Sequence, residues 1–432
     1  MDASSQVAKN TSVQILGRVV VVIATVITTA ILTRFLGASG YGNYIFITSF
    51  VALFTAISDW GTGIISIREA AKESKGGEKV FGNALVLRFI FALASFLAVN
   101  LLARILPQFQ DLILVATIAS VLLFLHSFRT SFHIVFQAKL RFENQALAEV
   151  LISTTFLLFL FLPLSIGLNL PWVMLFLVIA NLLGTALALI LARRLTRFDL
   201  GLEKPILRKI LSASIPTGAL LLIFSIYNRI DIFILQAIKG SVSVGIYGLA
   251  YKIHDNLILG AAFLMAALFP LLSRYAADLN SKTKLAVIYQ KTFDVLFLLG
   301  GGMVFIFFIF APLIIKAVGG EEFFESILVL RILVFATLLA YFNHLTGYTL
   351  IALGKQRASL TVAVVALIWN VGLNLVFIPR YSSLAAAGVT VATEGLVLFL
   401  TSFYLAKTFN LKPSLTFPKT LVEIIKTRGK IF

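Results

Sequence analysis

The sequence predicts an all-α integral membrane protein that crosses the bilayer about twelve times. Of its 432 residues, 59% are hydrophobic and 13% are charged, whereas about a quarter of a soluble domain is charged. A helix that crosses the hydrocarbon core needs about 20 apolar residues, and stretches of that length recur along nearly the whole chain. The connections between them are too short for a large catalytic domain outside the membrane.

The predicted spans are the apolar stretches that a window of about 19 residues detects. The first six lie at about 12–33, 43–66, 81–103, 112–135, 147–167 and 171–192. The second six lie at about 210–237, 245–271, 293–315, 326–353, 358–378 and 384–406. Pro216 predicts a kink in the seventh span, because proline removes a backbone hydrogen bond from a helix.

The distribution of Lys and Arg predicts the orientation. Cytoplasmic loops collect basic residues, and 25 of the 36 Lys and Arg residues fall on the side of the N-terminus, against five on the other side. We therefore expect a multi-pass protein of the plasma (inner) membrane with both termini in the cytoplasm. These loops account for the net charge of +17, so no nucleic-acid partner is expected, and the polar N-terminal segment is not typical of a signal peptide.

Internal repeats predict that the two sets of six spans are copies of one unit. Gly37-x4-Gly42-x-Tyr44 recurs as Gly240-x4-Gly245-x-Tyr247, and three shorter matches recur in the same order at corresponding loops. Because six is even, both copies would cross the membrane in the same direction, as parallel repeats. The predicted domains are a six-helix lobe at 1–200, a cytoplasmic linker at 201–209, a second six-helix lobe at 210–406 and a basic cytoplasmic tail at 407–432.

The composition excludes several kinds of chemistry. The chain has no Cys, which removes thiol nucleophiles and Cys-ligated zinc or iron–sulfur sites. Its four His residues are scattered and do not form a metal-binding spacing. We therefore predict no catalytic residue, no metal site and no cofactor, and a protein that is not an enzyme.

Six basic residues lie inside the predicted spans, where each costs about 2.5–3.5 kcal/mol at a lipid-facing helix centre. Arg129 and Arg331 lie near span ends and are expected to snorkel to the interface. Arg88 lies deeper, where it either anchors and pairs or faces a cavity. One face of the first span carries Gln14, Arg18, Thr25, Thr28, Thr29 and Leu32. This stripe is either a helix-packing surface or a cavity wall, and Arg18 favours the cavity.

The seventh and eighth spans are the richest in polar groups. The outer half of span seven contains Ser225, Asn228, Arg229, Asp231 and Gln236, and span eight contains Tyr247, Tyr251, Lys252, His254 and Asp255. These charges either pair as a structural network or line a site, and His254 is either a proton carrier or an ordinary hydrogen-bonding group. Counting the six bases against Asp59, Asp231, Asp255 and Glu394 leaves +2 within the membrane, which favours an anionic passenger.

The chain resembles a known family, the polysaccharide-repeat-unit (O-antigen-type) flippases of the multidrug/oligosaccharidyl-lipid/polysaccharide (MOP) exporter superfamily. The resemblance rests on Thr33-Arg34-Phe-Leu-Gly37-x2-Gly40-Tyr-Gly42-x-Tyr44 and on Asp231-x13-Gly245-x-Tyr247-x2-Ala250-x-Lys252. It implies two six-helix bundles forming a V-shaped central cavity lined by spans 1, 2, 7 and 8. Lipid-linked peptidoglycan-precursor flippases of this superfamily have fourteen spans, and this chain has room for twelve.

The family's activity implies the partners and the roles of the candidate residues. Such flippases carry a polyprenyl-(pyro)phosphate-linked oligosaccharide from the inner to the outer leaflet by alternating access, with membrane lipids around the lipid tail and other polysaccharide-assembly proteins as further partners. The candidate phosphate-binding residues are Arg18, Arg34, Arg88, Arg229 and Lys252. The candidates for contact with sugar hydroxyls are Gln14, Asn228, Tyr247 and Tyr251. Asp59, Asp231 and Asp255 are candidates for carrying a coupling proton or sodium ion, and the sequence leaves open which of them, if any, does so.

Two other functions stay open at this point. A cation-coupled multidrug antiporter of the same superfamily has a similar span pattern, but its passengers are mostly cationic, which the +2 interior disfavours. A membrane glycan polymerase or ligase would use the same lipid-linked substrate. It would need a long outer loop, and the outer loops here are only about ten residues or shorter.

Overall fold

The computed structural model describes residues 3–72, 77–139, 141–162, 169–196, 198, 201–278, 282–414, 416–418 and 426. Within these ranges the chain is helical and contains no strand, which confirms the predicted all-α class. The chain divides into two compact units, Met1–Ile232 and Phe233–Phe432. Large apolar side chains such as Leu97, Leu313 and Phe399 are more than half exposed, as expected for helices that face lipid.

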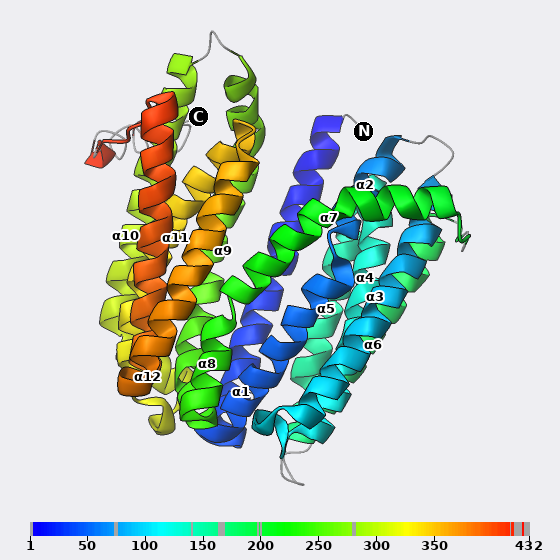
Figure 1. The fold of residues 1–432 in the computed structure, drawn as a ribbon, viewed down its shortest axis with the longest axis vertical. Helices are drawn as coiled ribbons and strands as arrows, with labels where there is room; N and C mark the ends of the chain where they lie inside the picture. The colour runs from blue at the N-terminus through cyan, green and yellow to red at the C-terminus, as the bar shows by residue number, and fades with distance from the viewer. Residues whose placement is uncertain are drawn as a thin grey trace. The chain divides into compact units, whose positions relative to one another are not determined.

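The first unit is a bundle of long helices, drawn from blue to green in Figure 1. They are α1 (Ala3–Asp59), α2 (Thr62–Lys72), α3 (Gly77–Ile105), α4 (Ile113–Ala138), α5 (Phe142–Phe159), α6 (Leu170–Arg193) and α7 (Lys204–Tyr227), with the short η1 (Pro107–Phe109) between α3 and α4. α4 packs between α3 and α6, and α5 packs between α1 and α6. Small residues allow close approach, since a Cβ on Gly184 of α6 would lie 2.2 Å from Ile152 of α5.

The second unit is built around α11, which packs on α9, α10 and α12. Its elements are α8 (Ile230–Lys239), which crosses the boundary between the units, α9 (Ser241–Ala277), α10 (Lys282–Gly319), the short η4 (Glu321–Phe323), α11 (Ser326–Ala352) and α12 (Gln356–Phe409). Its core is apolar and contains Met265, Leu272, Leu296 and Leu345, none of them more than 1% exposed.

Nine helices in the described ranges are long and apolar enough to cross a membrane. Two of them are pairs of spans joined at a kink, since α1 contains the non-helical residue Gly37 and α12 contains Ser382. With α5, which is 18 residues long, these segments account for the twelve predicted spans. The short outer loop expected between the first two spans is instead helix on both sides of Gly37, because one glycine with φ 64° suffices to redirect the chain.

The repeated glycines adopt the same backbone conformation. Gly37 has φ 64° and ψ −178°, and Gly240, its counterpart in the sequence repeat, has φ 79° and ψ −175°. This region of the φ/ψ map is accessible essentially to glycine alone. The shared conformation explains why glycine stands at both positions of the sequence repeat. The duplication itself stays a prediction.

The segment after α6 docks on the first unit. The ammonium group of Lys79 lies 2.8 Å from Glu203, and the Glu203 amide donates to Asn83 Oδ1 at 2.8 Å. Lys209 forms an ion pair with Glu69 at 2.6 Å. α7, which contains Pro216, therefore packs with the first unit, on α1, α2 and α3. The domain boundaries at 200 and 210 describe the sequence duplication and stay a prediction, as does the V-shaped cavity.

The first part of the predicted tail is tied to α10. Thr416 donates to Asp294 Oδ2 at 2.7 Å, Gln290 donates to the Ser414 carbonyl oxygen at 2.6 Å, and the Phe417 ring lies 4.8 Å from that of Phe297. Residues 411–414 and 416–418 thus form part of the second unit. Most of the remaining tail lies outside the described residues.

Candidate functional site

The predicted stripe on the first span divides into an exposed part and a buried part. Gln14 and Arg18 are exposed, whereas Thr28 and Thr29 are 7% exposed and Leu32 is 1% exposed. Thr25 and Thr29 each donate to the backbone carbonyl four residues earlier, at 2.7 and 2.8 Å. The later part of the stripe, which ends near Gly37, is therefore a packing surface. Its N-terminal part, at Gln14 and Arg18, carries the exposed polar groups. Arg34, near the kink, is exposed.

Arg88 lies in the interior of the first unit and holds a carboxylate. It is 2% exposed, forms an ion pair with Asp59, and lies 3.3 Å from the Ser131 hydroxyl. Asp59 also accepts the Gly63 amide at 3.2 Å, so this pair fastens the turn between α1 and α2 to α3 and α4. The structure thus pairs two candidate residues, Arg88 and Asp59, inside the first unit. Pairing was one of the two alternatives predicted for Arg88.

A second buried cation lies on α4. Arg129 is 7% exposed. Its Nε donates to Glu149 at 3.1 Å and one Nη donates to Asn181 at 2.8 Å. The expectation that Arg129 snorkels to the interface is wrong, because partners on α5 and α6 satisfy its charge inside the bundle.

The seventh predicted span breaks into α7 and α8, and the break carries three candidate residues. Asn228 is exposed and Arg229 is half-buried. Asp231 is 4% exposed, and its Oδ1 accepts the amide of Ile232 at 2.8 Å. The break places these polar groups at the end of α7 and in the first turn of α8, where backbone groups outside the helical pattern need partners.

In the second unit, α9 carries an aromatic row beside two charged residues. Tyr247 is fully buried, and its hydroxyl lies 3.2 Å from that of Thr390. Tyr251 lies between Tyr247 and His254, with 5.3 Å from its ring centroid to each of theirs. His254 Nδ1 lies 2.8 Å from the Thr337 hydroxyl, which agrees with the hydrogen-bonding alternative. Lys252 and Asp255 are half-buried.

Sequence reasoning missed a polar row on α12. Asn374 donates to Asn370 Oδ1 at 2.9 Å, and Asn370 donates to the Thr393 hydroxyl at 3.2 Å. Asn374 Oδ1 is buried and accepts no hydrogen bond from the described residues. The i,i+4 spacing of the two asparagines on an apolar span is the signal that could have found them. Nearby in sequence, Glu394 accepts from Asn343 of α11 at 2.7 Å.

The described residues contain no group of three or more His, Cys, Asp or Glu side chains that could hold a metal ion. The arginines of the first unit differ in whether an acid engages them. Arg88 and Arg129 are engaged by acids within the first unit, whereas Arg18 has no acidic partner among the described residues and is exposed. Arg18 is therefore a cation of the first unit that stays available to a ligand.

Comparison with known proteins gives the family. The sequence model of the family described as "Polysaccharide biosynthesis protein" matches residues 7–276, and the MatE model matches residues 216–376. An uncharacterized membrane protein of Methanocaldococcus jannaschii is 28% identical over 185 residues, which is 43% of each chain. The match thus spans less than half the length of that curated relative.

Solved structures give the same fold over nearly the whole chain. The lipid II flippase MurJ in an inward closed conformation has a TM-score of 0.74 at 12% identity, covering 98% of this chain and 93% of that one. An inward-facing MATE-family multidrug resistance transporter of the MOP superfamily has a TM-score of 0.73 at 17% identity, covering 95% and 96%. The predicted MATE-like fold class is confirmed. This multi-pass membrane protein belongs to the polysaccharide biosynthesis protein family.

Proposed function

We propose that this protein moves a polyprenyl-(pyro)phosphate-linked oligosaccharide from the inner to the outer leaflet for the assembly of a cell-surface polysaccharide. The family model that matches 7–276 supports a role in polysaccharide biosynthesis. The observation that carries the choice of an anionic lipid-linked substrate is Arg18, an exposed arginine on a membrane-spanning helix that no acid in the described part of the chain pairs with. Such a residue is costly in lipid and is expected to face water or an anion.

The proposed roles of the cations follow the path of the phosphate from the inner to the outer leaflet. Arg18 meets the pyrophosphate first, because it lies on the side of the N-terminus. Its guanidinium offers forked donors that match phosphate oxygens. Arg229 and Lys252 receive the phosphate further along, and Arg34 assists its release. Arg88, which is bound to Asp59 in the conformation described, contributes only when this pair opens. Sugar hydroxyls meet the exposed Gln14 and Asn228, whereas Tyr247 and Tyr251, which are buried in the conformation described, contribute only when α9 becomes accessible.

A negative-inside membrane potential assists the outward movement. One elementary charge moving through 100 mV changes the free energy by about 2.3 kcal/mol, and the pyrophosphate is an anion. Asp59, Asp231 and Asp255 are the candidate acids for carrying a coupling proton or sodium ion, and Asp59 would first have to leave Arg88 and the Gly63 amide. We place the protein in the plasma membrane with both termini cytoplasmic, beside further polysaccharide-assembly proteins.

A second candidate function is cation-coupled export of small organic molecules. The match of the MatE model to residues 216–376 favours it. The two functions differ in the charge of the passenger, because an organic cation would have to pass Arg18, Arg229 and Lys252.

The test is a flipping assay with the full chain reconstituted in vesicles. A fluorescent polyprenyl-diphosphate oligosaccharide is the probe, and a membrane-impermeant quencher reports the leaflet that it occupies. We expect flipping by the wild type and a loss of at least tenfold in the triple variant Arg18→Gln, Arg229→Gln and Lys252→Gln. Arg380→Gln is the matched control, because Arg380 is an exposed arginine outside the proposed site.

The same vesicles separate the two functions. Uptake of an organic cation without flipping of the lipid-linked sugar would identify the antiporter and contradict the proposal. Unchanged flipping by a folded triple variant would contradict the roles given to the three cations.

A further inference from the structure

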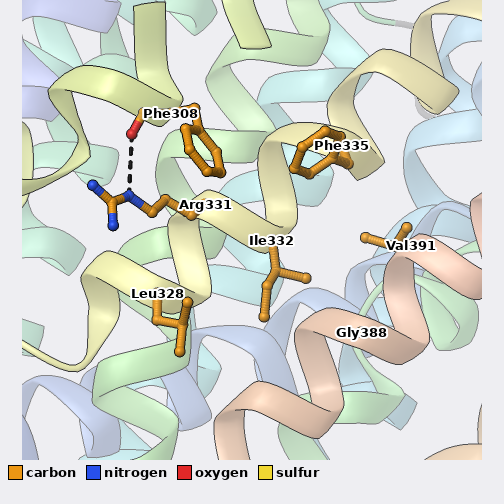
Figure 2. Close-up of a pocket in the computed structure, with 7 residues that line it drawn as sticks. All are labelled: Phe308, Leu328, Arg331, Ile332, Phe335, Gly388 and Val391. Carbon is orange, nitrogen blue, oxygen red and sulfur yellow. Dashed lines mark hydrogen bonds between the residues drawn. The ribbon is translucent and has the colours of Figure 1, made fainter. Parts of the chain in front are cut away.

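A groove in the second unit combines exposed apolar surface with one arginine (Figure 2). It has a volume of about 370 Å³ and is lined by Phe308 of α10, by Leu328, Arg331, Ile332 and Phe335 of α11, and by Gly388 of α12. Phe308, Leu328 and Phe335 are 40%, 51% and 45% exposed. The apolar walls suit a hydrocarbon chain, and the arginine is the one charged group among the lining residues.

The contacts of Arg331 leave most of its guanidinium available. Its Nε donates to the Phe308 carbonyl oxygen at 3.1 Å, the contact drawn in Figure 2. Its guanidinium carbon lies 5.2 Å from the centroid of the Phe308 ring. The two terminal amino groups make no hydrogen bond or ion pair with the residues that the structure describes. They form the forked donor pair that binds a phosphate group.

The position of Arg331 along α11 matches the level of lipid phosphates. α11 has 27 residues and is about 40 Å long, against a hydrocarbon core of about 30 Å. Arg331 lies five residues after the first residue of α11. If α11 stands upright and centred, Arg331 lies within a few ångströms of the boundary between hydrocarbon and headgroups. Its long side chain can therefore reach a phosphate at that level.

The groove extends along α11 on both sides of Arg331. Leu328, Ile332 and Phe335 share one face of the helix, at spacings of three and four residues, and extend over about 10 Å. Leu328 lies toward the N-terminal end of α11, and Ile332 and Phe335 lie toward the bilayer centre. Across from them, a side chain added at Gly388 would meet no atom within 4 Å. The glycine thus leaves open the space that a lipid chain would occupy.

We propose that this groove binds one membrane phospholipid from the leaflet at the N-terminal end of α11, with its phosphate on Arg331 and one acyl chain between α11 and α12. The site is separate from the proposed transport function and does not depend on it. A phospholipid held there would bridge α10, α11 and α12 and stabilise the second unit.

Native mass spectrometry of the delipidated full-length protein tests this site. The probes are phosphatidylglycerol and a diacylglycerol with the same chains, which lacks the phosphate. We expect the wild type to bind one phosphatidylglycerol molecule at least tenfold more tightly than the diacylglycerol. Arg331→Gln, which removes the phosphate contact, and Gly388→Leu, which fills the groove, should each weaken that binding at least tenfold.

Two matched variants serve as controls. Arg380→Gln removes an exposed arginine from α12, and Gly372→Leu adds the same side chain at another open glycine of α12; both should bind phosphatidylglycerol as the wild type does. Equal binding of the two lipids by the wild type would overturn the phosphate contact. Wild-type binding by folded Arg331→Gln would overturn the site, and this variant decides alone if Gly388→Leu fails to fold.

Discussion

The ion pair of Arg88 with Asp59 predicts an unequal response of the first unit to the loss of either charge. The Arg88 side chain is 2% exposed, whereas that of Asp59 is 29% exposed. Asp59→Asn keeps the shape and an oxygen acceptor but leaves the buried guanidinium without a counter-charge. Arg88→Met keeps most of the apolar volume and leaves a carboxylate that water can reach. We therefore expect Asp59→Asn to be the more destabilising of the two.

The size of the effect follows from burial. Removing one partner of a fully buried pair costs about 3–5 kcal/mol, and the partial exposure of Asp59 places this pair at the lower end, about 3 kcal/mol. At about 2 °C per kcal/mol for a unit of this size, Asp59→Asn should lower the apparent melting temperature of the purified protein in detergent by about 6 °C. The double variant with Arg88→Met should recover at least half of that loss, because no unpaired buried charge remains.

An exposed pair supplies the control. Lys79 and Glu203 lie 2.8 Å apart with side chains 54% and 41% exposed, so Glu203→Gln should cost at most about 1 kcal/mol. Thermal unfolding followed by differential scanning fluorimetry in one detergent measures all four variants. If the losses of the two single variants simply add in the double variant, the two charges are not energetically coupled and the reasoning is refuted.

Three further predictions test packing, hydrogen bonding and orientation. Gly218→Ala should destabilise the first unit by about 1–3 kcal/mol, because its Cβ would lie 2.8 Å from the backbone oxygen of Trp60; an unchanged melting temperature would contradict this packing. Tyr247→Phe removes the hydroxyl contact at 3.2 Å with a threonine of α12 and should cost about 0.5–1.5 kcal/mol by the same measurement. Since the chain has no Cys, single Arg380→Cys and Lys412→Cys variants report orientation. An impermeant maleimide should label the first in intact cells and the second only after permeabilisation, and the reverse pattern would invert the proposed topology.

The candidate site was only partly predictable, for reasons that particular residues show. The first span was expected to carry one continuous polar stripe, but Thr25 and Thr29 turn their hydroxyls to their own helix backbone, which helical periodicity alone does not reveal. Arg129 was expected at the interface, but Glu149 and Asn181, 20 and 52 residues away, satisfy it inside the bundle. The polar row at Asn370 and Asn374 was missed because the search for functional residues in this part of the chain followed charged side chains, and asparagine carries no charge.

The sequence by itself determined the environment, the helical class and the number of spans, because the burial of apolar residues in a bilayer depends on their total and their order along the chain. The sequence repeat also singled out Gly37 and Gly240, and the structure gives the reason that both are glycine, since each has a positive φ. Only the tertiary structure decided which cations form ion pairs with acids. Pairing within the membrane depends on distances between helices far apart in sequence, and those distances separate Arg88 and Arg129, held by acids, from the exposed Arg18.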